Sequence, residues 1–168
     1  MEILLNETIS FIVGIFSGWA FLYFLRVFRP KIGMSDKVAY GQDEDVLCVK
    51  IINKSRRHAT DIQAQALIQE CYSSDGGPKV RTLKYVKIRS STSFALGPVQ
   101  DLLKPWVIPS GRVFIMEEAS EILELLKNDN KVKLVFRVSL ADSLSSSKIV
   151  HQELYDSKSI KCGKFGTG

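Results

Sequence analysis

The most informative stretch of this chain is Thr8–Leu25, TISFIVGIFSGWAFLYFL, eighteen residues without one ionisable side chain. At about 1.5 Å per residue, a helix of this length spans roughly 27 Å, close to the thickness of the hydrocarbon core of a bilayer. Trp19 and Tyr23 belong to the residue types that favour the membrane interface. We therefore predict one N-terminal transmembrane helix, which makes this a membrane-anchored, single-pass protein.

The charges on the two sides of this helix predict its orientation. Glu2 and Glu7 precede it, without any Lys or Arg, whereas Arg26, Arg29 and Lys31 follow it closely. Lys and Arg are retained on the cytoplasmic side of a membrane. We therefore expect a cell-membrane protein with its N-terminus outside and its C-terminal domain in the cytoplasm. A cleaved signal peptide fits less well, because no basic region precedes the apolar stretch.

The chain divides into an anchor with a basic flank, residues 1–31, and one cytosolic domain, residues 32–168. The second part is 137 residues long, enough to bury a sizeable core. The chain carries a net charge of +5, most of it in this domain, and a basic domain favours an anionic membrane surface or ligand. The three cysteines are widely spaced, which is typical of reduced thiols in the cytosol.

Most of residues 32–168 has an apolar period of two. Apolar and polar residues alternate in Asp61–Gln69 and in Lys131–Val138, as expected of half-buried strands. Ala119–Lys127 instead has the apolar face of a short helix. Many short strands and one helix predict an all-β fold, an antiparallel β-sandwich. Four further segments are expected to be strands: Val46–Ile52, Val80–Ile88, Val107–Met116 and Lys148–Tyr155.

Several segments occur in an order that resembles the cytoplasmic domain of inward-rectifier potassium channels, following the end of their inner helix. The resemblance covers about residues 29–90 and 131–165. The segments that carry it are Arg29-Pro30-Lys31, Ser35-Asp36-Lys37-Val38-Ala39, Asn53-Lys54-Ser55-Arg56-Arg57, Asp61-Ile62-Gln63-Ala64-Gln65-Ala66, Lys133 to Ser139, Lys148-Ile149-Val150, Tyr155, Ile160 and Gly163-Lys164-Phe165.

The resemblance implies an immunoglobulin-like sandwich that assembles as a tetramer beneath the membrane. It also implies that Arg29 and Lys31 contact anionic lipid headgroups. It does not carry over potassium conduction, because a channel needs a pore helix and a filter of backbone carbonyls, and this chain has one span and no such motif.

Small residues mark one face of the predicted membrane helix. Ser10, Gly14 and Gly18 recur every four residues, with Ser17 beside them. Such small residues let a second helix approach closely, and hydroxyls can form hydrogen bonds across the contact. We therefore predict self-association of the chain, a homo-oligomer, through this face. The alternative is that Gly is simply common in membrane helices.

Two basic clusters are candidate sites for anions. Arg26, Arg29 and Lys31 are candidates for contact with anionic lipid, although retention on the cytoplasmic side explains them equally well. The second cluster is a candidate anionic-ligand surface, for which the alternative is the solvated outer face of a sandwich. Its members are Lys54, Arg56, Arg57, Lys79, Arg81, Lys84, Lys87 and Arg89.

The residue patterns of known enzymes and cofactor sites are missing. The two histidines, His58 and His151, lie on separate segments, outside any zinc, serine-hydrolase or Cys/His metal motif. We expect no catalytic residue, no metal and no cofactor. Nucleic acid is not an expected partner either, because no aromatic RNA-binding pattern is present.

Two classes of function remain open. The first is a single-pass sensor or effector, whose channel-like sandwich binds a cytosolic ligand or protein and rearranges an oligomeric bundle of helices, with altered membrane permeability as one outcome. The second is a membrane-tethered adaptor or accessory subunit that mediates protein–protein contact without a pore. Membrane lipids are partners in both.

Overall fold

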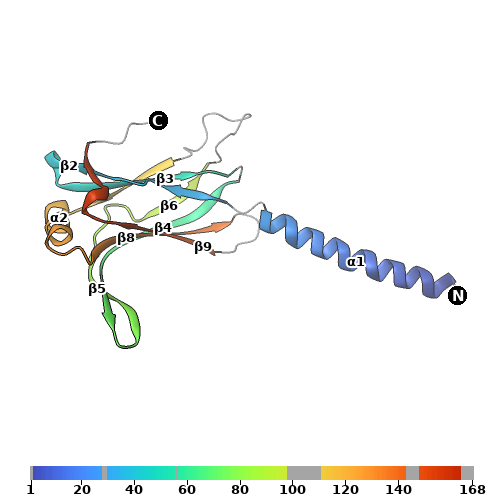
Figure 1. Cartoon of the computed structure of the whole chain (residues 1–168). Helices are drawn as coiled ribbons and strands as arrows, with labels where there is room; N and C mark the ends of the chain where they lie inside the picture. The colour runs from blue at the N-terminus through green and yellow to red at the C-terminus, as the bar shows by residue number, and fades with distance from the viewer. Residues whose placement is uncertain (1, 28–29, 56, 98–110, 143–147, 164–168) are drawn as a thin grey trace.

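The computed structural model describes residues 2–27, 30–55, 57–97, 111–142 and 148–163. It consists of an N-terminal helix, α1 (Glu2–Val27), followed by two facing β-sheets (Figure 1). α1 contains the whole predicted apolar stretch and projects away from the sheets. Within its most apolar window, Asn6–Phe24, 0% of the residues are buried. The helix is therefore no part of the core of the sandwich.

The first sheet is built around β3. β1 and β2 pair with the two halves of one edge of β3, and β7 pairs with the other edge. The short β10 extends the sheet beyond β2. The strands of this sheet are β1 (Ile32–Met34), β2 (Val38–Gly41), β3 (Val46–Asn53), β7 (Gly111–Met116) and β10 (Ile160–Cys162).

The second sheet is built around β4, whose 16 residues make it the longest described strand. β5 and β6 pair with the two halves of one edge of β4, β8 pairs with the other edge, and β9 pairs with β8. The strands are β4 (Ala59–Ser74), β5 (Gly77–Val86), β6 (Thr92–Leu96), β8 (Val132–Asp142) and β9 (Lys148–Tyr155). Three short helices complete the fold: η1 (Gln42–Glu44), α2 (Ala119–Asn128) and η2 (Ser157–Ser159).

The predicted all-β fold with one short helix after the apolar segment is confirmed, with one correction. The sandwich is not purely antiparallel, because β10 runs parallel to β2, with Ile160 opposite Val38. η2 carries the chain from β9 in the second sheet to β10 in the first, so that β10 enters that sheet in the direction of β2. The unexpected strand is only three residues long.

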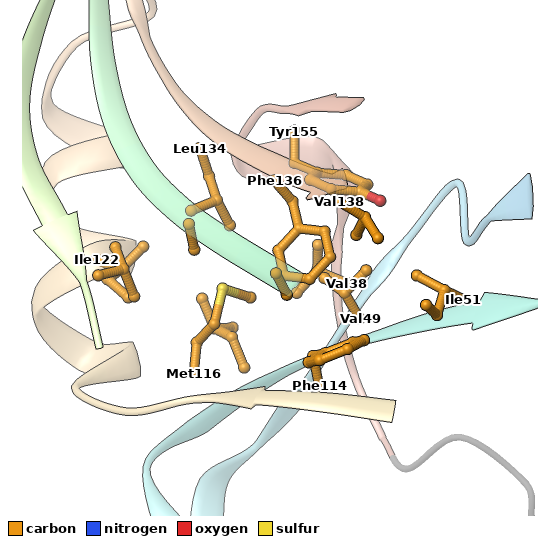
Figure 2. Close-up of a cluster of buried hydrophobic side chains, with 14 of the residues drawn as sticks. Val38, Val49, Ile51, Phe114, Met116, Ile122, Leu134, Phe136, Val138 and Tyr155 are labelled. Atoms are coloured by element: carbon orange, nitrogen blue, oxygen red, sulfur yellow. The ribbon is translucent and has the colours of Figure 1, made fainter. Parts of the chain in front are cut away.

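Alternate residues of the central strands face each other to form the core (Figure 2). The rings of Phe114 and Phe136 meet across the two sheets, with centroids 5.8 Å apart. α2 closes the end of the sandwich away from α1, and its Ile122 and Leu126 are buried (Figure 1). The apolar face predicted for this helix therefore packs on the core, as an amphipathic helix does.

Buried polar groups fix the connection between β3 and β4. Asn53 is fully buried, and its amide nitrogen donates hydrogen bonds to the carbonyl oxygens of Arg57 and Leu96, at 2.6 and 3.3 Å. The Arg57 guanidinium forms an ion pair of 3.1 Å with Asp142, whose side chain is buried. Because a buried charge needs a partner, this pair holds the connection against the last residue of β8.

Candidate functional site

The predicted association face of α1 is free of contacts from the rest of the chain as described. Ser10, Gly14, Ser17 and Gly18 are all exposed. A Cβ atom added at Gly14 or Gly18 would meet nothing within 4 Å. These glycines therefore make no room for another described part of the same chain. Their role in joining two helices stays a prediction.

Two of the basic residues predicted to contact lipid, Arg26 and Lys31, lie on either side of the end of α1, and the structure adds Lys54 to them. Arg26 belongs to α1, but its side chain, like all of Arg29, lies outside the described structure. Lys31 is exposed, and its carbonyl oxygen accepts a hydrogen bond of 2.7 Å from the backbone N–H of Lys54. The Lys54 side chain lies across Gly33, where a Cβ would collide with it. Lys54 is thus held beside the exit of the helix.

The predicted anionic-ligand surface is divided between separate places. Lys54 and Arg57 lie in the connection from β3 to β4, and Arg56 lies outside the described residues. Lys79, Arg81 and Lys84 belong to β5, with Lys87 and Arg89 following it. The structure therefore does not bring the members together as one surface.

Three of these basic side chains, those of Lys84, Lys87 and Arg89, lie close to glutamates that are distant in the sequence. Lys84 Nζ lies 2.7 Å from Glu118 and 2.6 Å from Glu121, which raises the pKa of Lys84 through both hydrogen bonds. Lys87 Nζ lies 2.7 Å from Glu117, and this contact lowers the pKa of the Glu117 carboxyl. The positive charges of Lys84 and Lys87 are therefore largely balanced by these glutamates.

Arg89 is shared in the same way, 3.5 Å from Glu117 and 3.6 Å from Glu44. These pairs are solvent-exposed, and exposed ion pairs add little stability. They do, however, remove Lys84, Lys87 and Arg89 as free anion-binding charges. Lys79 and Arg81 remain exposed on the β4–β5 hairpin.

A groove that the sequence pattern did not predict lies between β6, in the second sheet, and β7, in the first. It has a volume of about 550 Å³. Arg112 spans it from β7: its Nη1 donates a hydrogen bond of 2.8 Å to Ser93 Oγ, and its Nη2 one of 3.0 Å to Ser90 Oγ. Phe94 lies beside it with 90% of its surface exposed. The groove is lined by Arg89, Ser90, Ser93, Phe94, Ala95, Leu96, Gly111, Arg112, Val113 and Ile115.

Cysteine thiols and acidic side chains are the groups from which a metal site could be built. All three cysteines are free. Burial raises the pKa of the half-buried Cys48 thiol, with the Glu44 carboxylate adding to the effect. A protonated thiol is a poor nucleophile and metal ligand. No group of three or more His, Cys, Asp or Glu side chains among the described residues could hold a metal ion.

Comparisons with known proteins identify no family. No family model matches the chain, and no curated protein matches it. Among solved structures, the crystal structure of Spo0M, a sporulation control protein from Bacillus subtilis, is similar with a TM-score of 0.43 and 13% sequence identity. The match covers 79% of this chain and 49% of that one, so this chain spans about half the length of the structure that it matches. The class defined here is a two-sheet β-protein with an apolar N-terminal helix.

The resemblance to inward-rectifier potassium channels is wrong, because the similar structure is that of a sporulation control protein and not of a channel domain. The matched segments are short strands and turns that many sandwiches contain. Asn53–Arg57, for example, forms the internally bonded connection between β3 and β4. Lys164 and Phe165, which also contributed, lie outside the described residues. The tetramer that the resemblance implied loses its basis.

Proposed function

We propose that this protein is a membrane-tethered adaptor: α1 anchors it as a single span, and the sandwich binds a partner protein in the cytosol. The observation that carries the proposal is the exposure of α1, a helix long and apolar enough to cross a bilayer, with 0% of its most apolar window buried. So large an apolar surface needs an environment other than water. The acidic residues before the uncharged stretch Thr8–Leu25 and the basic residues after it support a cytosolic sandwich.

The adaptor is better supported than the sensor or effector. The sensor hypothesis took its channel-like part from the resemblance that the comparisons contradict. The groove between β6 and β7, in contrast, is a feature suited to protein contact, because it combines an exposed aromatic ring with a β7 edge that is only partly paired among the described residues. Altered membrane permeability has no observation of its own and is not part of the proposal.

We also propose that the sandwich is immunoglobulin-like in its strand pairing. β3 pairs with β7 in one sheet, and β5, β4, β8 and β9 follow one another in the other. This is the pairing of strands B with E, and of C′, C, F and G, in an immunoglobulin variable domain. The ends of such sandwiches and their edge strands are common places for partner contact.

Extraction and labelling test the anchor and its orientation. We expect the full-length protein to stay in the membrane pellet after alkaline carbonate washing. Phe16→Arg should release much of it, because a charge at the centre of a span costs about 2.5–3.5 kcal/mol. The exposed Cys71 and Cys162 allow labelling with a membrane-impermeant maleimide. We expect labelling only after permeabilisation. Release of the wild type by the carbonate wash, or labelling of intact cells, contradicts the proposal.

A further inference from the structure

The groove between β6 and β7 borders an edge of β7 that is only partly paired among the described residues, because Ile88 bridges to Met116 at one end of it. β6 pairs with β4 on one side, and β7 pairs with β3. The Ile115 carbonyl points away from β3, because it accepts a hydrogen bond of 2.9 Å from the backbone N–H of Arg89. Alternate residues of a strand direct their backbone groups to the same edge. The N–H and C=O of Val113 therefore also point to this edge, where no described strand pairs with them.

The charge of the groove is held in a fixed position. Two N–H groups of the Arg112 guanidinium bond to Ser93 and Ser90, and its carbon lies 5.4 Å from the centre of the Phe114 ring. A guanidinium has five donors, and serine hydroxyls leave its charge uncompensated. The described residues that line this groove include no Asp or Glu. Arg112 therefore offers this groove a positive charge that is bonded to neutral hydroxyl groups.

Phe94 gives the groove an apolar contact point. It is the most exposed large apolar side chain that the structure describes in the sandwich. A second hollow, of about 470 Å³, lies along the same ring and shares Ser93, Phe94 and Arg112 with the groove. Asp61 also lines that hollow, whereas the described lining of the groove includes no acidic residue, so an acidic group is favoured on the groove side of Phe94. Exposed aromatic and Arg side chains together are typical of protein-binding hot spots.

We propose that this groove binds an extended acidic segment of a partner protein. The segment adds as a strand along the free edge near Val113, places an Asp or Glu side chain against Arg112 and packs an apolar residue on Phe94. Strand addition supplies affinity through the backbone, and the pocket for alternate side chains supplies specificity. A carboxylate suits Arg112, because a guanidinium forms two parallel hydrogen bonds with it. The inference rests on the proposed adaptor function and names the site and the chemistry of the partner.

Selection from a random peptide library displayed on phage tests the site. The target is the full-length protein in biotin-labelled nanodiscs, with empty nanodiscs as the background. We expect the enriched peptides to share an Asp or Glu flanked by residues that favour strands. Failure to enrich any peptide, or a consensus without an acid, overturns the proposal. The carbonate extraction described above does not depend on this result. Failure of the groove proposal can therefore be distinguished from failure of the anchor proposal.

Binding of a selected, fluorescently labelled peptide then localises the site. We expect Arg112→Gln to weaken binding by about tenfold, as the loss of a charged hydrogen-bond partner does. Phe94→Ser should weaken it as well, and this exposed position carries little risk to folding. Arg81→Gln is the matched control, because Arg81 is an exposed arginine on β5, outside the groove. Binding that is unchanged by both groove variants, or equally weakened by Arg81→Gln, overturns the site.

Light scattering separates a partner segment from a second copy of this chain. If the groove takes a partner, Arg112→Gln leaves the mass of the protein in detergent unchanged. A mass that falls to that of a monomer in Arg112→Gln but not in Arg81→Gln makes a second copy the occupant, and overturns the proposal of a partner segment.

Discussion

Asp45, in the turn before β3, caps the N-terminus of α2 by contacting Ser120, which lies 75 positions later in the sequence. Its carboxylate accepts hydrogen bonds from the backbone N–H of Ser120, at 2.8 Å, and from the Ser120 hydroxyl, at 2.9 Å. Its carbonyl oxygen accepts another from the N–H of Ala119, at 3.1 Å. The first N–H groups of a helix have no partner within the helix. A residue distant in sequence therefore supplies the cap, whereas the residue at the N-cap position, Glu118, forms an ion pair with Lys84.

Replacing Asp45 by Ala is expected to destabilise the protein by about 1–2 kcal/mol, the usual cost of a lost helix cap. Asp45 has a left-handed backbone, with φ of 49°, which also disfavours Ala. Asp45→Gly is the control for this strain, because Gly accepts that conformation but removes the carboxylate. Urea unfolding of the full-length protein in detergent measures both. If both variants equal the wild type, the carboxylate does not cap α2.

Tyr155 predicts a loss of stability at alkaline pH. Its hydroxyl donates a hydrogen bond of 2.7 Å to the carbonyl oxygen of Ser35, and burial, assisted by the charge of Glu153, raises the pKa of Tyr155 to about 12. In the unfolded chain this pKa is about 10. The folded state therefore binds the proton more tightly. Its contribution to stability is complete below about pH 10 and is lost as the pH rises from about 10 to about 12.

Unfolding midpoints measured across this range, for the wild type and Tyr155→Phe, check this prediction. The variant should be less stable near neutral pH by about 1 kcal/mol, because the partly buried carbonyl of Ser35 loses its donor. It should also show a smaller decrease between pH 10 and 12, since it lacks the titrating hydroxyl. Two parallel pH profiles would show that Tyr155 does not cause the alkaline loss.

The main strands could be predicted from the sequence because their side chains alternate between the core and the outside. Lys148–Tyr155 has the same bounds in the structure as in the prediction, and the helix starting at Ala119 differs by one residue at its end. β1, β2, β6 and β10 were missed. They are three to five residues long, too short for a period to be visible, and β10 is defined only by its pairing with distant Val38.

The candidate groove could not be predicted, because its parts come from different strands and different sheets. Arg112 belonged to an expected strand, and nothing in the order of residues places it against Ser93. For Lys84, in contrast, the sequence suggested a free positive charge that the structure does not show. Lys84 lies in a run without acidic residues, but it pairs with glutamates at the start of α2. Local charge counting fails where the fold brings opposite charges together from distant segments.

The small-residue face of α1 predicts a change in oligomer size. Gly14→Ile or Gly18→Ile should lower the mass of the full-length protein in a mild detergent, because the larger side chain separates the helices. Ala20→Ile is the matched control, since this substitution introduces the same branched side chain elsewhere on the helix. Native mass spectrometry gives the mass of each variant. An unchanged mass in both glycine variants would remove this face from any association of the chain.

The basic flank of α1 predicts binding to anionic lipid. A peptide of residues 24–40, which contains Arg26, Arg29 and Lys31, should co-sediment with vesicles that contain phosphatidylserine. Each of these residues changed to Gln should weaken binding by about 1 kcal/mol, and the binding should fall with added salt. Lys37→Gln, farther from the helix, should have the smaller effect. Binding that ignores the anionic lipid content would leave these charges with their role in orientation alone.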